Sequence, residues 1–265
     1  MPRMTASVEI KNLTASYSPA ETVIDNLSMS IAPGEFVCIL GPSGCGKSTL
    51  LSILSGLKAP TSGEVLIGGR PIEVGATTAD GPRMGFVFQD PRLLPWRTVS
   101  ENISFALTAA GVPREEHDEI IMQHLKMLQI ESLAHAWPAA ISGGQRQRAS
   151  IARALAINPA YVLMDEPFST LDEVTARILR QELLRVWEET GKTIIFVTHS
   201  IREAVLMADR VFILAARPGR LHRIMPVDLP RPRDYEDPRL TEIEANVVSD
   251  VLQVWGLDAA ATSPA

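Results

Sequence analysis

A short apolar run that leads directly into a glycine-rich loop constrains the fold of this chain more than any other feature. The run Phe36–Leu40 has the length and composition of a buried strand. The next segment, Gly41–Ser48, reads G-P-S-G-C-G-K-S and fits the pattern G-x-x-x-x-G-K-[ST]. Leucines at 50, 51, 54 and 57 follow it with the spacing of one helix face. The sequence therefore predicts a strand, a tight loop and a helix in direct succession.

This loop has the composition of a phosphate-binding loop. Its glycines let backbone N–H groups close around phosphate oxygens, which side chains at several of these positions would prevent. A helix that begins near Lys47 directs the positive end of its dipole at the same place. We expect Lys47 to reach the β- and γ-phosphates of a nucleotide and Ser48 to ligate Mg²⁺. A chance glycine-rich turn is the alternative, and the flanking strand and helix argue against it.

Two further apolar runs end in residues that suit catalysis. Tyr161–Met164 is followed by Asp165 and Glu166, and Thr193–Thr198 is followed by His199. Ligands of open α/β sheets bind outside the carboxyl ends of the strands. Neighbouring residues of an extended segment face different ways, so Asp165 is predicted to hold Mg²⁺ and Glu166 to polarise an attacking water. The alternatives are a solvated acidic pair and a structural histidine.

The pattern along the chain predicts an α/β protein with a helical insertion. Short alternating strands occupy residues 7–40, helical periodicity dominates 98–157, and strand–helix alternation then resumes. We expect one domain, with a core over about 6–97 and 158–225, a helical subdomain over about 98–157 and a C-terminal extension over 226–265. Helices are predicted at Glu101–Ala110, Arg114–Ile130, Ser142–Ile157, 172–190, 200–208 and roughly 238–255.

Composition excludes several classes of protein. A net charge of −6 and a pI near 5.5 argue against a general nucleic-acid binder. Two cysteines, Cys38 and Cys45, do not make a disulfide scaffold. Cys45 is either a reactive thiol at a helix start or an inert small residue. No apolar run approaches the roughly 18–20 residues of a membrane span, so we expect no membrane-spanning helix.

A second helix start carries the motif that relates this chain to a known family. Residues Ile141–Arg148 read I-S-G-G-Q-R-Q-R, and Ser142 with the two glycines predicts another anion site at a helix N-terminus. Simple capping of the helix is the alternative. In this motif the chain resembles the ATP-binding subunits of ABC transporters, whose signature is L-S-G-G-Q, with Ile141 in place of leucine. The likeness extends over nearly the whole chain in the family's order.

The resemblance implies a fold and an activity. The fold would be α/β, with a P-loop (RecA-like) ABC ATPase core, an antiparallel β subdomain and an inserted α-helical subdomain. The activity would be ATP hydrolysis that powers transport, with ATP and Mg²⁺ as cofactors. Two copies would pair head to tail as a homodimer, each ATP lying between the loop at 41–48 of one copy and Ser142–Gly144 of the other. Residues 169–172 resemble the loop that crosses this dimer, with Thr170 where alanine is usual.

The resemblance also assigns roles to individual residues. The catalytic residues would be Glu166 as base, His199 as the switch histidine, Lys47 and Gln89. Mg²⁺ would be held by Ser48, Gln89 and Asp165. The nucleotide would be bound by Tyr17, which stacks on adenine, and by Gly41, Pro42, Ser43, Gly44, Cys45, Gly46, Lys47, Ser48, Thr49, Ser142, Gly143, Gly144 and Gln145.

The segment after Gln89 suggests a partner. Leucines at 93 and 94 and Trp96 lie between prolines and either form a docking surface or are buried under nearby helices. In the family this region receives the coupling helix of an integral membrane permease subunit. The protein would then sit peripherally at the cytoplasmic face of the cell membrane. A periplasmic or extracellular solute-binding protein would join it indirectly through the complex, and no nucleic acid is expected.

The segment L-P-W-R-T-V at residues 94–99 and the tail Leu229–Arg233 resemble segments of the ATP-binding subunits of nitrate, sulfonate and taurine importers. An exporter or a lipoprotein-release motor is the alternative. A soluble ABC ATPase that acts on DNA or ribosomes would usually carry coiled coils, zinc cysteines or basic tracts, which this sequence lacks. A P-loop kinase would leave 141–148 unexplained. The transported substrate cannot be predicted, because its site belongs to other subunits.

Overall fold

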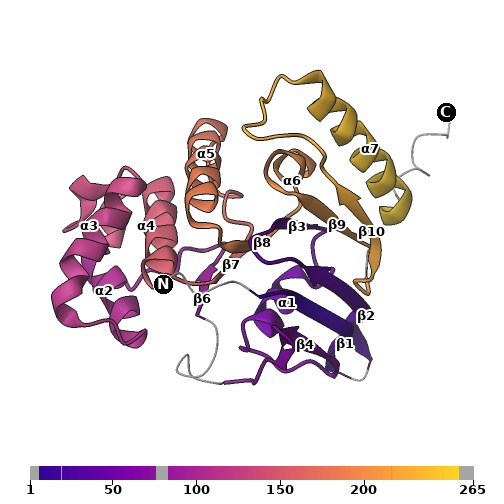
Figure 1. Ribbon diagram of the computed structural model, residues 1–265, viewed down its shortest axis with the longest axis horizontal. Coiled ribbons are helices and arrows are strands. Elements are labelled where there is room, and N and C mark those ends of the chain that lie inside the picture. Colours follow the sequence, from indigo (N-terminus) through magenta and orange to yellow (C-terminus); the bar gives the residue numbers. More distant parts are fainter. Residues whose placement is uncertain (1–5, 19, 76–82, 216, 257–265) are drawn as a thin grey trace. The chain divides into compact units, whose positions relative to one another are not determined.

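The computed structural model describes residues 6–18, 20–75, 83–215 and 217–256. These residues form two compact units, which are described separately. We call residues 83–194 the central unit, and residues 6–75 together with 195–256 the terminal unit. Figure 1 labels the helices and strands. Within the described ranges, no helix combines the length and apolar character that a membrane crossing requires.

The terminal unit contains an antiparallel sheet with the strand order β2-β1-β4-β5. Its register places Ile10 opposite Met29 on one side and opposite Val65 on the other. Alternate residues of the long strands are buried, as expected for a sheet with one face on a core. This sheet is the predicted antiparallel β subdomain. Its strands are β1 (Val8–Ser18), β2 (Glu21–Ile31), β4 (Ser62–Ile67) and β5 (Arg70–Pro71).

A second sheet of the terminal unit combines parallel and antiparallel pairs, and its strand β3 is fully buried. Strand β3 (Phe36–Leu40) pairs in parallel with β9 (Arg210–Leu214), and β10 (Leu221–Pro226) runs antiparallel to β9. On its other side β3 neighbours β8 (Thr193–Thr198), the strand at which the two units divide. All five residues of β3 are buried, which explains its unbroken apolar sequence. The helices of this unit are α1 (Lys47–Leu54), α6 (Ile201–Met207) and α7 (Pro238–Trp255).

The central unit holds the helical insertion between two parallel strands. Strand β6 (Met84–Val87) pairs with β7 (Tyr161–Asp165), and Met84 lies opposite Tyr161. Helix α4 contacts α2, α3 and β6, so it is the centre of this unit, as Figure 1 shows. Half of its buried residues are alanines, which permit close packing. The helices are α2 (Val99–Ala109), α3 (His117–Met127), α4 (Gly143–Ala156) and α5 (Glu173–Thr190), with 3-10 turns at 114–116, 131–133 and 138–140.

The mixed α/β class predicted from the sequence is confirmed, and most elements lie within a few residues of the predicted ranges. Strand Thr193–Thr198 and the last helix have the predicted bounds. Strands β9 and β10 were not predicted, and the proline–glycine segment at 217–219 is the connection between them. The first two strands are long rather than short, at 11 residues each. The subdomain boundaries at 98 and 157 stay a prediction.

Two arginines of the C-terminal extension close the end of α6. The guanidinium of Arg233 donates hydrogen bonds of 2.7 Å to the backbone oxygens of Val205 and Ala208. Arg231 donates one of 2.6 Å to the backbone oxygen of Met207. The last carbonyls of a helix lack partners within it, so these side chains satisfy them. Burial, followed by the charge of Arg231, lowers the pKa of Arg233 to about 10, which leaves the guanidinium charged at neutral pH.

We therefore expect Arg233→Ala to lower the free energy of unfolding by about 2 kcal/mol, because it leaves several half-buried carbonyls unpaired. Urea denaturation measures this change. Arg239→Ala is the control, since the Arg239 side chain is 66% exposed and pairs with Asp237 on the surface. The control should change stability by less than about 0.5 kcal/mol. Equal unfolding midpoints for the two variants would contradict the assignment.

Candidate functional site

The glycine-rich loop lies between β3 and α1, as the sequence predicted. Gly46 caps α1 with a positive φ of 97°, and Gly44 has a φ of 78°. Glycine adopts these angles at little steric cost. A Cβ at Gly46 would also lie 2.7 Å from a side-chain carbon of Ile24 on β2. Conformation and packing therefore both require glycine at position 46.

Lys47 extends back across the loop that it follows. Its ammonium donates hydrogen bonds of 2.7 Å to the backbone oxygen of Gly41 and 3.0 Å to that of Pro42. The side chain is 6% exposed, so the charge is held close to the loop. An ammonium fixed among backbone groups at a helix N-terminus is suited to bind phosphate.

Exposure separates the other loop residues into two groups. Ser43 and Ser48 are exposed, so their hydroxyls are accessible to a ligand. Cys45 is fully buried, and a Cβ on Gly41 would lie 2.6 Å from its sulfur. The structure thus favours an inert packing role for Cys45 over a thiol open to reagents.

Tyr17 is connected to the start of α1. Its hydroxyl lies 2.8 Å from Oγ1 of Thr49, and its ring is 64% exposed. The ammonium of Lys58 lies 3.6 Å from the ring centroid, which is a cation–π contact. The hydroxyl bond and the cation orient a largely exposed aromatic ring, which is the arrangement a stacking platform requires. Tyr17 and Thr49 were predicted from the sequence, whereas Lys58 was not, because nothing in the local spacing indicates this contact.

His199 follows β8 and is exposed in the terminal unit. The residues on either side of it are fixed. The hydroxyl of Thr198 donates a 2.7 Å hydrogen bond to Glu203 and accepts one of 3.0 Å from the backbone N–H of Ser200. Ser200 caps α6 through the backbone N–H of Glu203. His199 therefore projects from a turn that is held at both ends.

Asp165 and Glu166, the two acids with predicted roles in catalysis, lie at the end of β7 in the central unit. Asp165 is the last residue of the strand, and both acids are half-buried. Glu166 has a φ of 43°, an uncommon conformation for a residue with a side chain. Backbone strain of this kind persists only where the surrounding structure holds the residue in place, and it is concentrated at functional sites.

Gln89 reaches the same region of the central unit through one serine. Its amide Nε2 lies 3.3 Å from Oγ of Ser169, and this hydroxyl donates a 3.0 Å hydrogen bond to the backbone oxygen of Glu166. The structure thus brings Gln89 and Glu166 together, although they are far apart in sequence. Ser169 is a supporting residue that sequence reasoning placed only in the 169–172 loop.

Helix α4 holds the segment around Gln89. The buried amide of Gln147 donates a 3.3 Å hydrogen bond to the backbone oxygen of Phe88. Arg153 donates bonds of 2.8 Å and 2.7 Å to the backbone oxygens of Pro91 and Arg92. Sequence reasoning missed both supporting residues, since only the fold brings them to this loop.

Ser142 begins the same helix with a capping box. Its hydroxyl accepts the backbone N–H of Gln145, and the Gln145 side chain accepts the N–H of Ser142. These bonds confirm the local capping role and leave the N–H groups of Gly143 and Gly144 at the exposed helix end. A Cβ at Gly144 would lie 2.9 Å from Thr175, whereas Gly143 has more open surroundings. The anion site predicted here stays a prediction.

A strand–loop–helix with these glycine angles and a lysine folded over the loop defines a P-loop nucleotide-binding protein. A family model described as ABC transporter matches residues 24–169. The chain belongs to the ABC transporter family, as an ATP-binding subunit that hydrolyses ATP.

Several curated proteins resemble the chain over most of its length. An uncharacterized ABC transporter ATP-binding protein of Methanocaldococcus jannaschii is 42% identical, over 93% of this chain and 92% of that protein. An aliphatic sulfonates import ATP-binding protein of Bacillus subtilis is 42% identical, over 86% and 87%. A taurine import ATP-binding protein of Burkholderia pseudomallei is 40% identical, over 92% and 95%.

Solved structures agree with this family. A dimeric ATP-binding cassette bound to ADP and Pi in a post-hydrolysis state has a TM-score of 0.73 and 35% identity, covering 84% of this chain and all 100% of that one. A subunit of an ABC transporter complex from Clostridium perfringens has a TM-score of 0.75 and 28% identity, covering 94% and 95%.

The position of Lys47 leads to a test of nucleotide binding. ATP at about 100 times its dissociation constant should add about 2.7 kcal/mol to the unfolding free energy of the unaltered chain and nothing to Lys47→Ala. Thermal unfolding with and without ATP measures both. Lys11→Ala is the control, since Lys11 lies on the surface beside Glu9 and should keep the full effect of ATP. An ATP-induced shift in Lys47→Ala equal to that of the control would contradict the role.

Proposed function

We propose that this protein is the ATP-hydrolysing subunit of an importer for a small anionic or zwitterionic solute such as a sulfonate, taurine or nitrate. The observation that carries the proposal is the P-loop with Lys47 folded over it, in a chain about 40% identical to named sulfonate and taurine import subunits. In this proposal the protein lies peripherally at the cytoplasmic face of the membrane, beside integral permease subunits. A solute-binding protein outside the membrane joins through the same complex.

Each part of the P-loop has a role toward ATP. The backbone N–H groups of residues 43–46 and the ammonium of Lys47 bind the β- and γ-phosphates. Tyr17 stacks on adenine with the exposed face of its ring. The free Ser48 hydroxyl is accessible where the loop enters α1, which suits a ligand of Mg²⁺.

The residues present fit Mg²⁺, which prefers oxygen ligands and keeps contacts to phosphate and water. Ser48, Asp165 and Gln89 offer a hydroxyl, a carboxylate and an amide oxygen. Among the described residues there is no group of three or more His, Cys, Asp or Glu that could hold a metal by itself. Bound Mg²⁺ supplies neutralisation of phosphate charge.

Hydrolysis depends on Glu166 and His199. Glu166 acts as the base that orients and polarises the attacking water, and its backbone has a positive φ at the end of β7. Gln89, linked to Glu166 through Ser169, senses the same centre. His199, on its braced turn, hydrogen-bonds the γ-phosphate or the water. These roles follow the family's pattern residue by residue.

Two copies of the chain form the active state. Ser142, Gly143, Gly144 and Gln145 of one copy close over the ATP held by the other, with the N-terminus of α4 directed at the γ-phosphate. The dimeric cassettes among the similar solved structures support this arrangement. Loss of the γ-phosphate would remove a charge that holds the two copies together.

Glu166→Gln should therefore reduce ATP hydrolysis at least about 100-fold while ATP binding persists, because the amide cannot act as a base. We expect the variant to accumulate as an ATP-dependent dimer in gel filtration. Glu189→Gln is the control: its side chain is 57% exposed on α5, and its activity should match that of the unaltered chain. A monomeric Glu166→Gln variant at saturating ATP and Mg²⁺ would contradict the proposed dimer.

Trp96 supports docking to a permease. Trp96 is 69% exposed, so the alternative that it is buried under nearby helices is wrong. Buried Asn102 holds the loop with hydrogen bonds of 3.2 Å to the Leu94 oxygen and 3.1 Å to the Arg97 oxygen. Phe105, 49% exposed on α2, adds to the surface. A rigid loop that displays tryptophan suits the anchor of an interface.

We expect Trp96→Ser to weaken binding to the permease about 30-fold, as loss of an aromatic anchor does, without changing ATP affinity. Co-purification of the complex and ATPase stimulation by solute measure this effect. Trp137→Ser is the matched control, because Trp137 is also half-exposed in the central unit. Unchanged assembly in the Trp96 variant would contradict the docking role.

The same complex tests direction and substrate. Co-purification with a permease and a solute-binding protein, followed by a search for the solute that stimulates ATPase activity, would support import. Stimulation without any solute-binding protein would favour an exporter or a lipoprotein-release motor.

A further inference from the structure

Residues 217–220, which lead into β10, lie beside the P-loop. Gly219 pairs with Ile24 of β2, accepts a 3.1 Å hydrogen bond from the N–H of Asp25 and donates one of 2.8 Å to the oxygen of Val23. A Cβ at Gly219 would collide with the backbone oxygen of Cys45. The connection is therefore fixed to the edge of β2 and in contact with the loop.

Arg217 extends from this connection over Gly44. A Cβ built on Gly44 would lie 3.1 Å from the guanidinium carbon Cζ of Arg217 and 3.0 Å from its Nε. The guanidinium thus occupies the space that a side chain at position 44 would take. The absence of a side chain at Gly44 and the anchored Gly219 place this exposed charge beside the P-loop.

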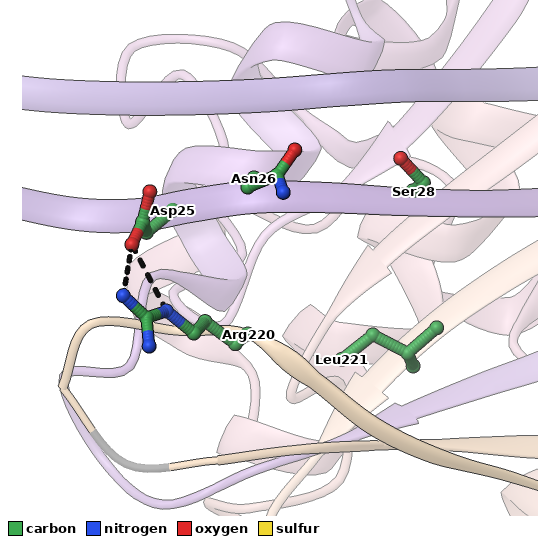
Figure 2. A pocket seen from close by; sticks show the side chains of 5 residues that line it. All are labelled: Asp25, Asn26, Ser28, Arg220 and Leu221. Carbon is green, nitrogen blue, oxygen red and sulfur yellow. Dashed lines mark hydrogen bonds and ion pairs between the residues drawn. The ribbon is translucent and has the colours of Figure 1, made fainter.

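The charge of Arg217 is not compensated by an acid within the described part of the chain. No described carboxylate forms an ion pair with it, whereas the nearby Arg220 donates two hydrogen bonds to Asp25. Figure 2 shows this pair beside Asn26 and Ser28, in a shallow pocket along β2. The two arginines of the connection therefore differ. Arg220 is neutralised by the surface carboxylate of Asp25, whereas Arg217 faces the P-loop.

We propose that Arg217 is an additional nucleotide-affinity residue, whose positive charge strengthens the binding of ATP and ADP by the P-loop. The inference rests on the proposed phosphate-binding role of this loop. A phosphate oxygen held by the Gly44 N–H cannot lie more than about 9 Å from the Arg217 guanidinium carbon, given ordinary bond and hydrogen-bond lengths. That limit is comparable to the Debye length of about 8–10 Å at physiological salt, so the charges interact.

A purely structural role for Arg217 makes different predictions. A guanidinium that only covers Gly44 would stabilise the loop regardless of ligand charge or salt. A charge that acts on phosphates should matter more for a triphosphate than for a monophosphate, and its effect should decrease as salt screens it. Ligand charge and ionic strength therefore separate the two roles.

The test uses the full chain and fluorescent N-methylanthraniloyl derivatives of ATP and AMP, titrated at low and at physiological salt. Arg217→Gln removes the charge and keeps most of the side chain, and Arg217→Lys retains the charge. Arg220→Gln is the matched control on the same connection. We expect Arg217→Gln to weaken ATP binding about threefold to tenfold at low salt, and less at physiological salt. Arg217→Lys and Arg220→Gln should remain near the unaltered affinity.

The outcomes are distinguishable. A larger loss for ATP than for AMP, reduced by salt, supports the proposal. Equal ATP affinity for Arg217→Gln and Arg220→Gln at low salt overturns it, and so does a loss that is the same for both nucleotides at every salt concentration. Absence of ATP binding by the unaltered chain, or equal binding by Lys47→Ala, would instead overturn the proposed function of the loop.

Discussion

The constraint on which the rest depends is a P-loop backbone shaped so that its N–H groups can approach an anion closely. It requires a loop without side chains on its inner surface, held firmly enough not to collapse. Lys47 contributes through its hydrogen bonds to the loop's own oxygens, and β2 lies against Gly46. On the outer side the connection around Gly219 touches Cys45. Elements from widely separated parts of the sequence therefore support one short turn.

Local sequence patterns predicted the helices and strands whose start and end signals lie within the element itself. Strand β8 is a continuous apolar run with clear ends, and α7 begins with an aspartate cap followed by proline. Strands β9 and β10 were missed for a physical reason. The first follows α6 after only two residues, and the second alternates weakly, with exposed polar residues at 222 and 223. Their pairing, more than their composition, makes them strands.

The residues of the candidate site likewise divide into those that local motifs predict and those that only tertiary contacts bring together. Its motif residues have fixed spacing, so the sequence alone predicts roles for Lys47, Ser142 and Asp165. The supporting contacts join residues far apart, such as Gln147 with Phe88, and no spacing encodes them. The environment of Trp96 was also undetermined, because it depends on how Asn102 ties the preceding loop to α2. Sequence motifs thus predict which residues carry the chemistry, and tertiary contacts determine how those residues are positioned.

The dependence of α6 on Arg231 and Arg233 has a consequence for biosynthesis. The central unit is continuous in sequence, whereas the terminal unit combines residues from both ends of the chain. On the ribosome, the P-loop strand emerges early, but the carbonyls at the end of α6 acquire their arginine partners only after residue 233 has left the exit tunnel. A nascent chain would therefore carry α6, which packs against the P-loop strand β3, with an incompletely paired end until residue 233 has been added.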